Sequence, residues 1–539
     1  MKTLDKYILP VGAIIITILL WLYLQKSQLF IFHYREQHQL FLYDTDFLKS
    51  TLFQIGGFTQ ICALYLVQFF SENYWGALIT ACCATAIACF IWLGAKRLFN
   101  VPTYFMPICY IPPLLQISAL ADTYFSYSAL TTMLIISALF YISSLLFSKK
   151  RRIIFAIAVI CLCFIAYLTA YQPNNYYEPL LKAPSYCSWG WIAMIVCFVL
   201  GFFIRYLPHL SNMVKSLVSV VFIISISLGF LKISTQRIDP SNYKFLELNS
   251  YVVNSNWDKV IETCNQTELN NTLYLNYLNL ALSHKGLLLQ RLFTYPQNGV
   301  KSLLCDYQKI PDIIQLQSFV YYQMGNVAAA QNTAFSASVC NRLGSPSALQ
   351  MLVKTNMAYG AYKVAEKYIA QLRKTWKYKS WASYYRSLLT DEQKLAEDKE
   401  IVNLRKSLTN QDHFAVALGV DSDLDLIVEA NPDNEAAKDY LISMLLLSKN
   451  NENIRYFVDK YSGTSVLSEV PEILQEAIYS IAEQEPDYLK SHGVSDAVFD
   501  KYDSFYNKFM QSRNARRNPA IDLKREFGKT YWYYLMFNK

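Results

Sequence analysis

Residues 127–171 read YSALTTMLIISALFYISSLLF, then SKKRR, then IIFAIAVICLCFIAYLTAY. Each apolar run is close to the roughly 20 helical residues that cross the hydrocarbon core of a bilayer. The basic group between them, Lys149 to Arg152, is typical of a cytoplasmic loop, because Lys and Arg are strongly retained on that side. The stretch therefore predicts two membrane helices joined by a cytoplasmic turn.

Further apolar runs extend this pattern over the first 234 residues. We predict seven spans, near residues 8–24, 52–70, 76–95, 127–147, 153–171, 189–206 and 214–232. Residues 101–120 are also apolar, but they contain Pro102, Pro107, Pro112 and Pro113. Proline removes backbone donors that lipid cannot replace, so we expect this segment to be broken or re-entrant and buried against protein. Whether it crosses the membrane is left open.

The basic residues also predict the topology. Lys2 and Lys6 place the N-terminus on the same side as Lys149 to Arg152, which requires an even number of spans between them. Four spans satisfy this if residues 101–120 do not cross, and they leave Lys96 and Arg97 outside as the one violation. Counting onward from Arg152 places residues 235–539 outside the cytoplasm.

The two halves differ in charge. The chain has 539 residues, of which 53% are hydrophobic and 17% charged, with a net charge of +8. Residues 1–234 hold 15 of the 49 Lys and Arg but only 7 of the 41 Asp and Glu, so residues 235–539 hold 34 of each. Because the second half has no excess of basic residues, binding of nucleic acid is disfavoured.

The cysteines indicate neither a metal array nor a disulfide framework. Nine of the 12 lie in the first half, without metal-ligand spacing. Cys264, Cys305 and Cys340 lie in the second half, where one disulfide could form in an oxidising compartment, with its pairing left open.

The second half has the pattern of a helical repeat array. Amphipathic helices alternate with short Gly, Asn and Pro turns, and Gly325 and Gly360 stand 35 residues apart in Tyr321–Ala330 and Asn356–Ala365. That spacing is close to the tetratricopeptide period. A third unit begins at Asn431, which we expect to cap a helix with Pro432 in its first turn. The predicted fold is all-α, a polytopic transmembrane domain over 1–234 followed by a tetratricopeptide-like α-solenoid over 235–539.

Aromatic side chains are the candidate binding groups of this half. Arrays of this kind present a concave face to extended partners. Tyr321, Tyr322 and Trp381 are candidates for contact with carbohydrate or peptide, since their rings offer an apolar face and a polar rim. The alternative is that these rings fill the gaps between helices.

The loop predicted between the first two spans holds the densest polar cluster of the membrane half. It contains His33, Arg35, Glu36, His38, Asp44 and Asp46. Asp44 and Asp46 could bind a divalent cation, the one cofactor considered, or one of them could act as a general base. Arg35, Glu36 and His38 are candidate substrate-binding residues.

Two further acidic residues fall in predicted outer loops, Asp122 and Glu178. Acidic groups gathered at one membrane face near broken backbone would form a plausible site, with Asp122 as a second catalytic carboxylate. The alternative is that all these acids only make the loops soluble.

Several segments resemble an uncharacterised bacterial family that joins a polytopic membrane domain to a tetratricopeptide-like tail. They are Leu278–Gly286, Phe293–Gln297, Tyr322–Gly325, Lys367–Thr375, Lys379–Ala382 and Gly528–Tyr534. The resemblance spans nearly the whole chain and implies an inner-membrane protein with a periplasmic C-terminal domain. The order of a first span, an acidic outer loop, further spans and an outer soluble domain is also similar to glycosyltransferases of the GT-C fold, which use polyprenyl-phosphate sugar donors.

Two functions remain open. In the first, the protein is a glycosyltransferase or oligosaccharyltransferase that binds a polyprenyl-phosphate-linked donor in the membrane and a polypeptide or glycan acceptor on its repeats. In the second, it is a non-catalytic scaffold or assembly factor whose repeats recruit envelope proteins. No Walker loop, dinucleotide fingerprint or nucleophile elbow occurs in the sequence, so kinase, dehydrogenase and hydrolase functions have no support.

Overall fold

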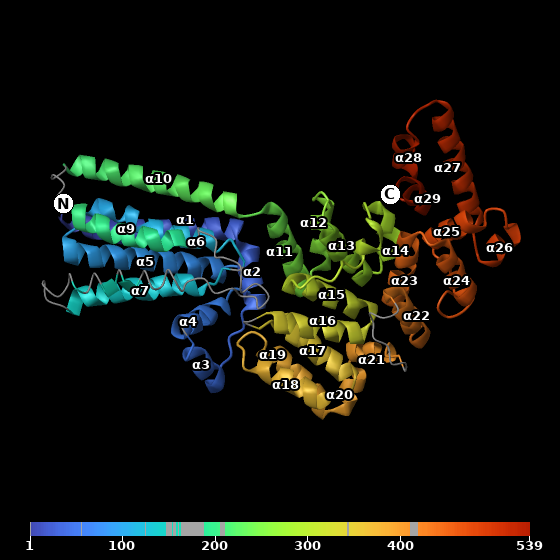
Figure 1. Ribbon diagram of the computed structural model, residues 1–539, viewed down its shortest axis with the longest axis horizontal. Helices are drawn as coiled ribbons and strands as arrows, with labels where there is room; N and C mark the ends of the chain where they lie inside the picture. The colour runs from blue at the N-terminus through green and yellow to red at the C-terminus, as the bar shows by residue number, and fades with distance from the viewer. Residues whose placement is uncertain are drawn as a thin grey trace. The chain divides into compact units, whose positions relative to one another are not determined.

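The computed structural model describes residues 2–54, 56–123, 125–146, 154, 158–159, 161–162, 188–204, 211–341, 344–409 and 419–538. Every regular element in these residues is a helix (Figure 1). The chain divides into two compact units. Unit 1 contains Met1–Glu247, Val339–Pro346 and Gln371–Ser380, and unit 2 contains Leu248–Ser338, Ser347–Ala370 and Trp381–Lys539. Two short segments of the second half of the sequence therefore fold as part of unit 1.

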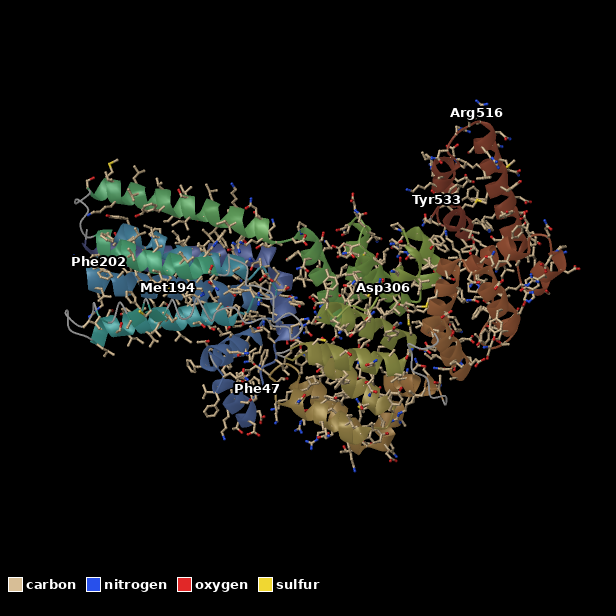
Figure 2. The ribbon with its side chains drawn as sticks, viewed as in Figure 1. Phe47, Met194, Phe202, Asp306, Arg516 and Tyr533 are labelled. Carbon is tan, nitrogen blue, oxygen red and sulfur yellow. The ribbon has the colours of Figure 1, made fainter. Side chains whose placement is uncertain are left out.

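Unit 1 is built around a bundle of long apolar helices. Its elements are α1 (Lys2–Ser27), α2 (Leu29–His38), α3 (Thr45–Leu52), α4 (Gly57–Val67), α5 (Trp75–Phe99), η1 (Thr103–Phe105), η2 (Pro107–Tyr110), α6 (Ile111–Ala119), α7 (Ser128–Leu146), α9 (Trp189–Ile204), α10 (Asn212–Arg237) and the first part of α11 (Pro240–Val253). The side chains shown in Figure 2 fill this bundle, and Met194 of α9 is fully buried in it.

Among the described residues, four helices are long and apolar enough to cross a membrane. They are Pro10–Ser27, Trp75–Phe99, Ser128–Leu146 and Met213–Arg237. These correspond to four of the seven predicted spans. The predicted span at 189–206 is the shorter apolar helix Trp189–Phe203. Most of the predicted span at 153–171 lies outside the described residues.

The predicted span at 52–70 is wrong, because the chain breaks there into α3 and α4. The first helix ends at Leu52, and Gly56, the N-cap of α4, adopts φ 75°, a left-handed conformation that redirects the chain before the second helix. A Cβ on Gly57 would clash with the backbone of Thr51, so the chain can turn this tightly only at a glycine. The remaining apolar helix, α4, has 11 residues and is too short to cross the hydrocarbon core.

The directions of α5 and α7 decide the path of residues 101–120. The hydroxyl of Tyr127, just before α7, lies 3.1 Å from Thr80 near the start of α5, and the ring of Phe140 lies directly against Gly94 near its end. The two helices therefore run parallel, and the chain between them must return across the bundle. The segments η1, η2 and α6 make this return as a broken helix, with Phe105 and Ile117 fully buried. The break was expected, and the return across the bundle was left open by the sequence.

The other helices of unit 1 follow from the same contacts. Thr17 of α1 lies 2.6 Å from Thr85 of α5 between their hydroxyl oxygens. The amide of Gln25, near the end of α1, donates to the carbonyl of Asn73, just before α5, so α1 runs antiparallel to α5. The N-terminus of α1 and the C-termini of α5 and α7 thus share one end of the bundle. At the other end, Arg237 at the end of α10 lies over the ring of Trp189 at the start of α9.

Unit 2 consists of shorter helices. They are α12 (Trp257–Asn265), α13 (Thr272–His284), α14 (Leu288–Arg291), η4 (Leu292–Thr294), η5 (Gly299–Ser302), α15 (Pro311–Met324), α16 (Val327–Cys340), α17 (Pro346–Ala358), α18 (Tyr362–Arg373), α19 (Lys379–Thr390), α20 (Glu392–Glu397), α21 (Lys399–Lys406), α22 (Val420–Ala430), α23 (Glu435–Ser448), α24 (Asn451–Tyr461), α25 (Glu472–Ala482), α26 (Pro486–Ser491), α27 (Asp496–Asn514), α28 (Pro519–Phe527) and α29 (Tyr531–Phe537). The ends of α16 and α18 and the start of α19 belong to unit 1.

Two helical hairpins of unit 2 repeat the same turn. Gly325 joins α15 to α16 with φ 79°, and Gly360 joins α17 to α18 with φ 71°. In both turns the residue after the glycine donates its N–H to the carbonyl five positions earlier, Asn326 to Tyr321 at 3.0 Å and Ala361 to Asn356 at 2.8 Å. This is the pattern of a Schellman helix end, which needs a residue that tolerates positive φ. The predicted role of these two glycines is confirmed.

The third predicted unit starts later than expected. The N-cap of α23 is Asn434, whose side chain accepts from the N–H of Ala437, and not Asn431. Asn431 instead ends α22 and donates to Asn403 and Ser407.

Near the C-terminus, α29 is buried through Tyr531 and Trp532, and Glu476 accepts from the N–H of Tyr531 at 2.7 Å.

Candidate functional site

The polar segment predicted to be an outer loop is a buried helix. Residues Leu29–His38 form α2, which directly follows α1. Arg35 is 1% exposed and Glu36 is 4% exposed, and Gln37 and His38 are buried as well. Hydropathy predicts a loop there because these side chains are polar. In the fold each of them finds a partner from a distant part of unit 1, so the segment can be helical and buried.

Arg35 holds a turn of unit 1 together. Its guanidinium donates to the backbone carbonyls of Leu120 at 2.8 Å, Asp122 at 2.9 Å and Phe125 at 2.6 Å, which follow the C-terminus of α6. A cation at this position also interacts favourably with the helix dipole. Burial lowers the pKa of Arg35 to about 10, so it remains charged at neutral pH. Its two terminal nitrogens donate to backbone, and its Nε has no partner among the described residues, so its role as a substrate-binding residue stays a prediction.

Glu36 lies in a closed network. Its carboxylate accepts from the hydroxyl of Tyr378 at 2.7 Å and the amide of Gln37 at 2.6 Å, and Lys377 lies 3.4 Å away. Burial raises the pKa of Glu36, and the three neighbours partly oppose that rise. The donors surround the carboxylate and leave it closed to a substrate.

The two histidines of α2, His33 and His38, lie near the same network. The Nδ1 atom of His38 lies 2.8 Å from the side-chain amide of Asn341, and its ring packs on Tyr34. Burial lowers the pKa of His33 to about 4, and the charge of Lys377 contributes to this shift. His33 is therefore neutral at physiological pH.

Asp44 and Asp46 lie at the start of α3, beyond this network. Asp44 occupies the N-cap position and forms an ion pair with Lys374 at 3.0 Å, while Asp46 is exposed in the first turn. Within the described residues, no three His, Cys, Asp or Glu side chains are grouped so as to hold a metal ion. The role of this pair as base or metal ligand stays a prediction.

Asp122 is placed in a different neighbourhood. It lies in the turn after α6 and lines a small pocket of about 210 Å³ together with Arg237 and Asp239. Its charge also acts on Arg35. Glu178, the other predicted outer acid, lies outside the described residues. The structure thus brings Asp122 near two arginines rather than beside the pair at α3.

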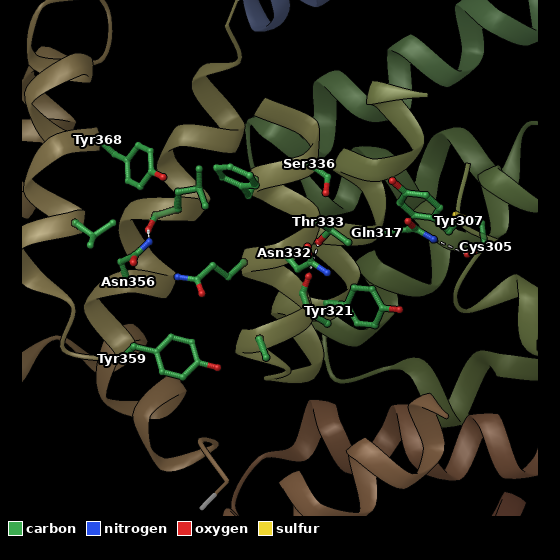
Figure 3. Close-up of a pocket in the computed structure, with 16 residues that line it drawn as sticks. Cys305, Tyr307, Gln317, Tyr321, Asn332, Thr333, Ser336, Asn356, Tyr359 and Tyr368 are labelled. Carbon is green, nitrogen blue, oxygen red and sulfur yellow. Dashed lines mark hydrogen bonds between the residues drawn. The ribbon is translucent and has the colours of Figure 1, made fainter. Parts of the chain in front are cut away.

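A second, larger pocket lies in unit 2. It has a volume of about 970 Å³ and lies between the hairpins α15–α16 and α17–α18 (Figure 3). In Figure 3, Asn356, Tyr359 and Tyr368 lie on one side of the opening, and Tyr307, Gln317 and Tyr321 lie on the other. A volume of this size is at the upper end of the range for small-molecule sites.

The pocket is formed by equivalent positions of the two hairpins. In the first hairpin, the residues eight and four positions before Gly325 and four and eight positions after it all line the pocket. The residues at the same four positions around Gly360 line it as well. The pairs are Gln317 with Leu352, Tyr321 with Asn356, Ala329 with Val364 and Thr333 with Tyr368. Positions four apart share one face of a helix, so both hairpins turn the same face to the pocket.

The lining is uncharged and partly aromatic. Among the described residues that line the pocket, none is Asp, Glu, Lys, Arg or His. Tyr307, Phe335 and Tyr359 stand at its rim and are 57%, 53% and 45% exposed. Exposed large rings around a concave surface are typical of binding sites.

One wall of the pocket contains an unsatisfied acceptor. The side chain of Gln317 is 3% exposed, and its amide nitrogen donates to the carbonyl of Cys305 at 2.8 Å. Its amide oxygen is buried and has no donor among the described residues. Most such groups in proteins are paired, so this oxygen marks a place where a ligand could supply a donor.

Of the three aromatic residues predicted to bind in this half, only Tyr321 lines the pocket. Tyr322 donates to Glu400 at 2.6 Å, and Trp381 packs on Tyr385 at 4.2 Å between ring centroids. The first contact joins α15 to α21, and the second lies within α19, so the binding role of these two rings stays a prediction. Seven of the missed lining residues could have been found by counting four and eight positions from each turn glycine.

The three cysteines of the second half are free thiols. Cys264, Cys305 and Cys340 are all buried. The disulfide considered for this half does not form in the structure.

A sequence model of a family of unknown function, DUF6057, matches residues 6–170 and 164–538. The chain belongs to this family. No curated protein and no solved structure matches the chain. Membership of DUF6057 agrees with the resemblance to an uncharacterised family and assigns no activity.

Proposed function

We propose that the protein is a membrane-anchored binding protein, in which unit 1 holds the chain in the membrane and unit 2 takes an uncharged ligand into its pocket. The proposal shares only the non-catalytic role of the scaffold considered from the sequence, whose repeats were expected to recruit envelope proteins. The observation that carries it is the pocket of about 970 Å³ with no charged side chain among its described lining residues and with exposed rings at its rim. The glycosyltransferase function stays a prediction.

The arrangement of basic residues supports an extracytoplasmic unit 2. Lys96 and Arg97, at the end of α5, lie at the same end of the bundle as the N-terminus and the end of α7, which Lys149 to Arg152 follow in the sequence. The violation at Lys96 therefore disappears, because residues 52–70 do not cross and residues 101–120 return across the bundle. The positive-inside rule then assigns this end to the cytoplasm and the end of α10 to the other side.

A reporter fusion tests this topology. Alkaline phosphatase joined after residue 538 should be active, since it folds only outside the cytoplasm, and the same enzyme joined after residue 100 should be inactive. The reverse result would place unit 2 in the cytoplasm.

A pocket-obstructing variant tests the binding function. Ala328 is exposed on α16 and lines the pocket, so Ala328→Trp should place a large ring at the pocket wall and obstruct part of its volume. Ala497→Trp places the same side chain on an exposed position of α27, outside the pocket, and is the matched control. Full-length protein in nanodiscs is immobilised and exposed to pools of neutral blocked peptides and of neutral oligosaccharides.

The wild-type protein and Ala497→Trp should retain members of at least one neutral pool, and Ala328→Trp should retain at least tenfold less. Equal retention by all three proteins, or none by any of them, contradicts the proposed function.

A further inference from the structure

The chemistry of the pocket in unit 2 narrows the class of its ligand. The pocket carries four side-chain amides, Gln317, Gln331, Asn332 and Asn356. Each side-chain amide has one carbonyl acceptor and one NH₂ donor group, which is the same complement as a peptide unit. A surface rich in such groups can pair with both the N–H and the C=O of an extended backbone.

The described lining of the pocket has no charged side chain, so charged ligands would find no group of opposite charge there. A phosphate, a carboxylate or an ammonium group would lose its hydration in the pocket without meeting an opposite charge from the described lining residues. Transferring an unpaired ion to such a place is strongly unfavourable. A lipid phosphate, an acidic peptide and a basic peptide are therefore poor fits.

The proportion of apolar and polar surface in the pocket lining favours a polypeptide ligand over a glycan. Most of the lining surface is apolar, and it includes Ala328, Leu352, Val364 and the ring of Phe335. A sugar carries hydroxyl groups on most of its carbons and needs a dense set of partners, often carboxylates. A polypeptide instead alternates backbone polar groups with side chains, which can be apolar and rest on carbon surface.

Gln317 supplies the second, independent observation. Its buried oxygen lacks a donor among the described residues, while its nitrogen is fixed on the carbonyl of Cys305. That fixed nitrogen determines the orientation of the amide, so the free group is an acceptor. An N–H group of a bound backbone is the complementary donor.

We infer that the pocket between α15–α16 and α17–α18 binds an uncharged polypeptide segment in an extended conformation, through its backbone N–H groups and apolar side chains. This inference rests on the proposed binding function and names the ligand class. Gln317 accepts from a backbone N–H, the exposed amide of Asn332 pairs with a second peptide unit, and the rim rings of Tyr307, Phe335 and Tyr359 cover the side chains.

The test compares four probe pools on full-length protein in nanodiscs. The first holds acetylated and amidated hexapeptides of Leu, Tyr, Ser, Asn and Gly. The second holds the same peptides with N-methyl groups at alternate residues, which removes half of the backbone donors and keeps the side chains. The third replaces Ser and Asn by Lys and Glu, and the fourth contains maltohexaose and chitotetraose. Retained molecules are quantified by mass spectrometry.

The first pool should be retained at least threefold more than the N-methylated pool and at least tenfold more than the charged pool. In Gln317→Met, which keeps the shape of the side chain without its acceptor, the difference between the first two pools should shrink. Asn332→Ala changes an exposed position and should lower the retention of the first pool about threefold. This second variant keeps the inference testable if Gln317→Met does not fold.

Two results overturn the inference and leave the proposed function standing. One is equal retention of the N-methylated and unmodified peptides, and the other is retention of the oligosaccharides alone with loss in Ala328→Trp. If neither neutral pool distinguishes Ala328→Trp from Ala497→Trp, both the inference and the proposed function fail.

Discussion

The network around α2 and the pocket of unit 2 contain polar side chains for opposite reasons. In the α2 network, Arg35 and Glu36 are buried and their charges are paired with three backbone carbonyls and with Tyr378, Gln37 and Lys377. In the pocket, uncharged amides and rings form the lining, and the buried amide oxygen of Gln317 has no donor among the described residues. A dense group of charges thus marks a structural junction here, and an uncharged surface marks the candidate site. Substitutions in the α2 network should therefore lower the stability of the fold, and substitutions in the pocket should lower ligand binding.

The largest loss of stability is expected for Arg35→Met. The change leaves the carbonyls of Leu120, Asp122 and Phe125 without their donor, and such buried losses are each worth about 1–3 kcal/mol. We expect a loss of about 3–5 kcal/mol in the free energy of unfolding, by analogy with broken buried charge pairs. Thermal unfolding in detergent measures it. Lys49→Met, on an exposed position of α3, is the control and should change little. A loss below about 1 kcal/mol would remove the structural role assigned to Arg35.

A smaller loss is expected for Tyr378→Phe. It removes the donor to one oxygen of Glu36 and leaves the buried carboxylate less well paired. The expected loss is about 1–3 kcal/mol. Tyr359→Phe removes a hydroxyl from the exposed pocket rim and should stay within about 0.5 kcal/mol of the wild type. Equal losses of unfolding free energy in Tyr378→Phe and Tyr359→Phe would contradict the distinction between a closed structural network and an open pocket.

The pH dependence of stability should identify Glu36. Burial raises the pKa of Glu36 in the folded chain above its ordinary value of 4.5, so the folded state holds the proton more tightly than the unfolded state. Its contribution to stability is therefore greatest below pH 4.5 and is lost as the pH rises through the folded pKa. Glu36→Gln should flatten this part of the profile, measured by unfolding between pH 4 and 8. Glu72→Gln, on an exposed carboxyl, should keep the wild-type slope, and a slope unchanged in Glu36→Gln would contradict the assignment.

The smallest effect on stability is expected for Phe335→Ala. The ring is 53% exposed at the pocket rim, so its removal should change the free energy of unfolding by no more than about 0.5 kcal/mol. Retention of the neutral peptide pool should nevertheless fall at least threefold, because exposed rings at a binding surface carry much of the contact energy. A loss of stability without a loss of retention would show that Phe335 packs rather than binds.

Local patterns in the sequence predict much of the helical architecture. The apolar runs near 8–24, 76–95, 127–147 and 214–232 match the four helices that are long and apolar enough to cross a membrane. The 35-residue spacing of Gly325 and Gly360 predicts two equivalent hairpins, and both glycines have the positive φ that their turns require. These features depend on hydropathy over one helix length or on a single backbone conformation, which neighbouring residues are sufficient to specify.

The candidate sites are less accessible to such patterns. A count of polar residues identifies α2, but it cannot distinguish a reactive cluster from a paired one. The partner of Glu36 is Tyr378, 342 positions away, and that of His38 is Asn341, 303 positions away. Similarly, Gln317 and Tyr368 each lie eight positions from the turn glycine of their hairpin, but nothing local indicates that a cavity opens between those positions.

The sequence by itself determined the helical class, the four described helices long and apolar enough to cross a membrane, and the hairpin turns, because hydrophobic length and the positive φ of glycine act within a few residues. Only the tertiary structure decided that residues 101–120 return across the bundle, that the charges of α2 are paired and buried, and that the uncharged faces of two hairpins enclose a pocket. These three outcomes depend on which distant groups become neighbours, since burial and pairing of a polar group are set by the partners that the whole fold brings to it.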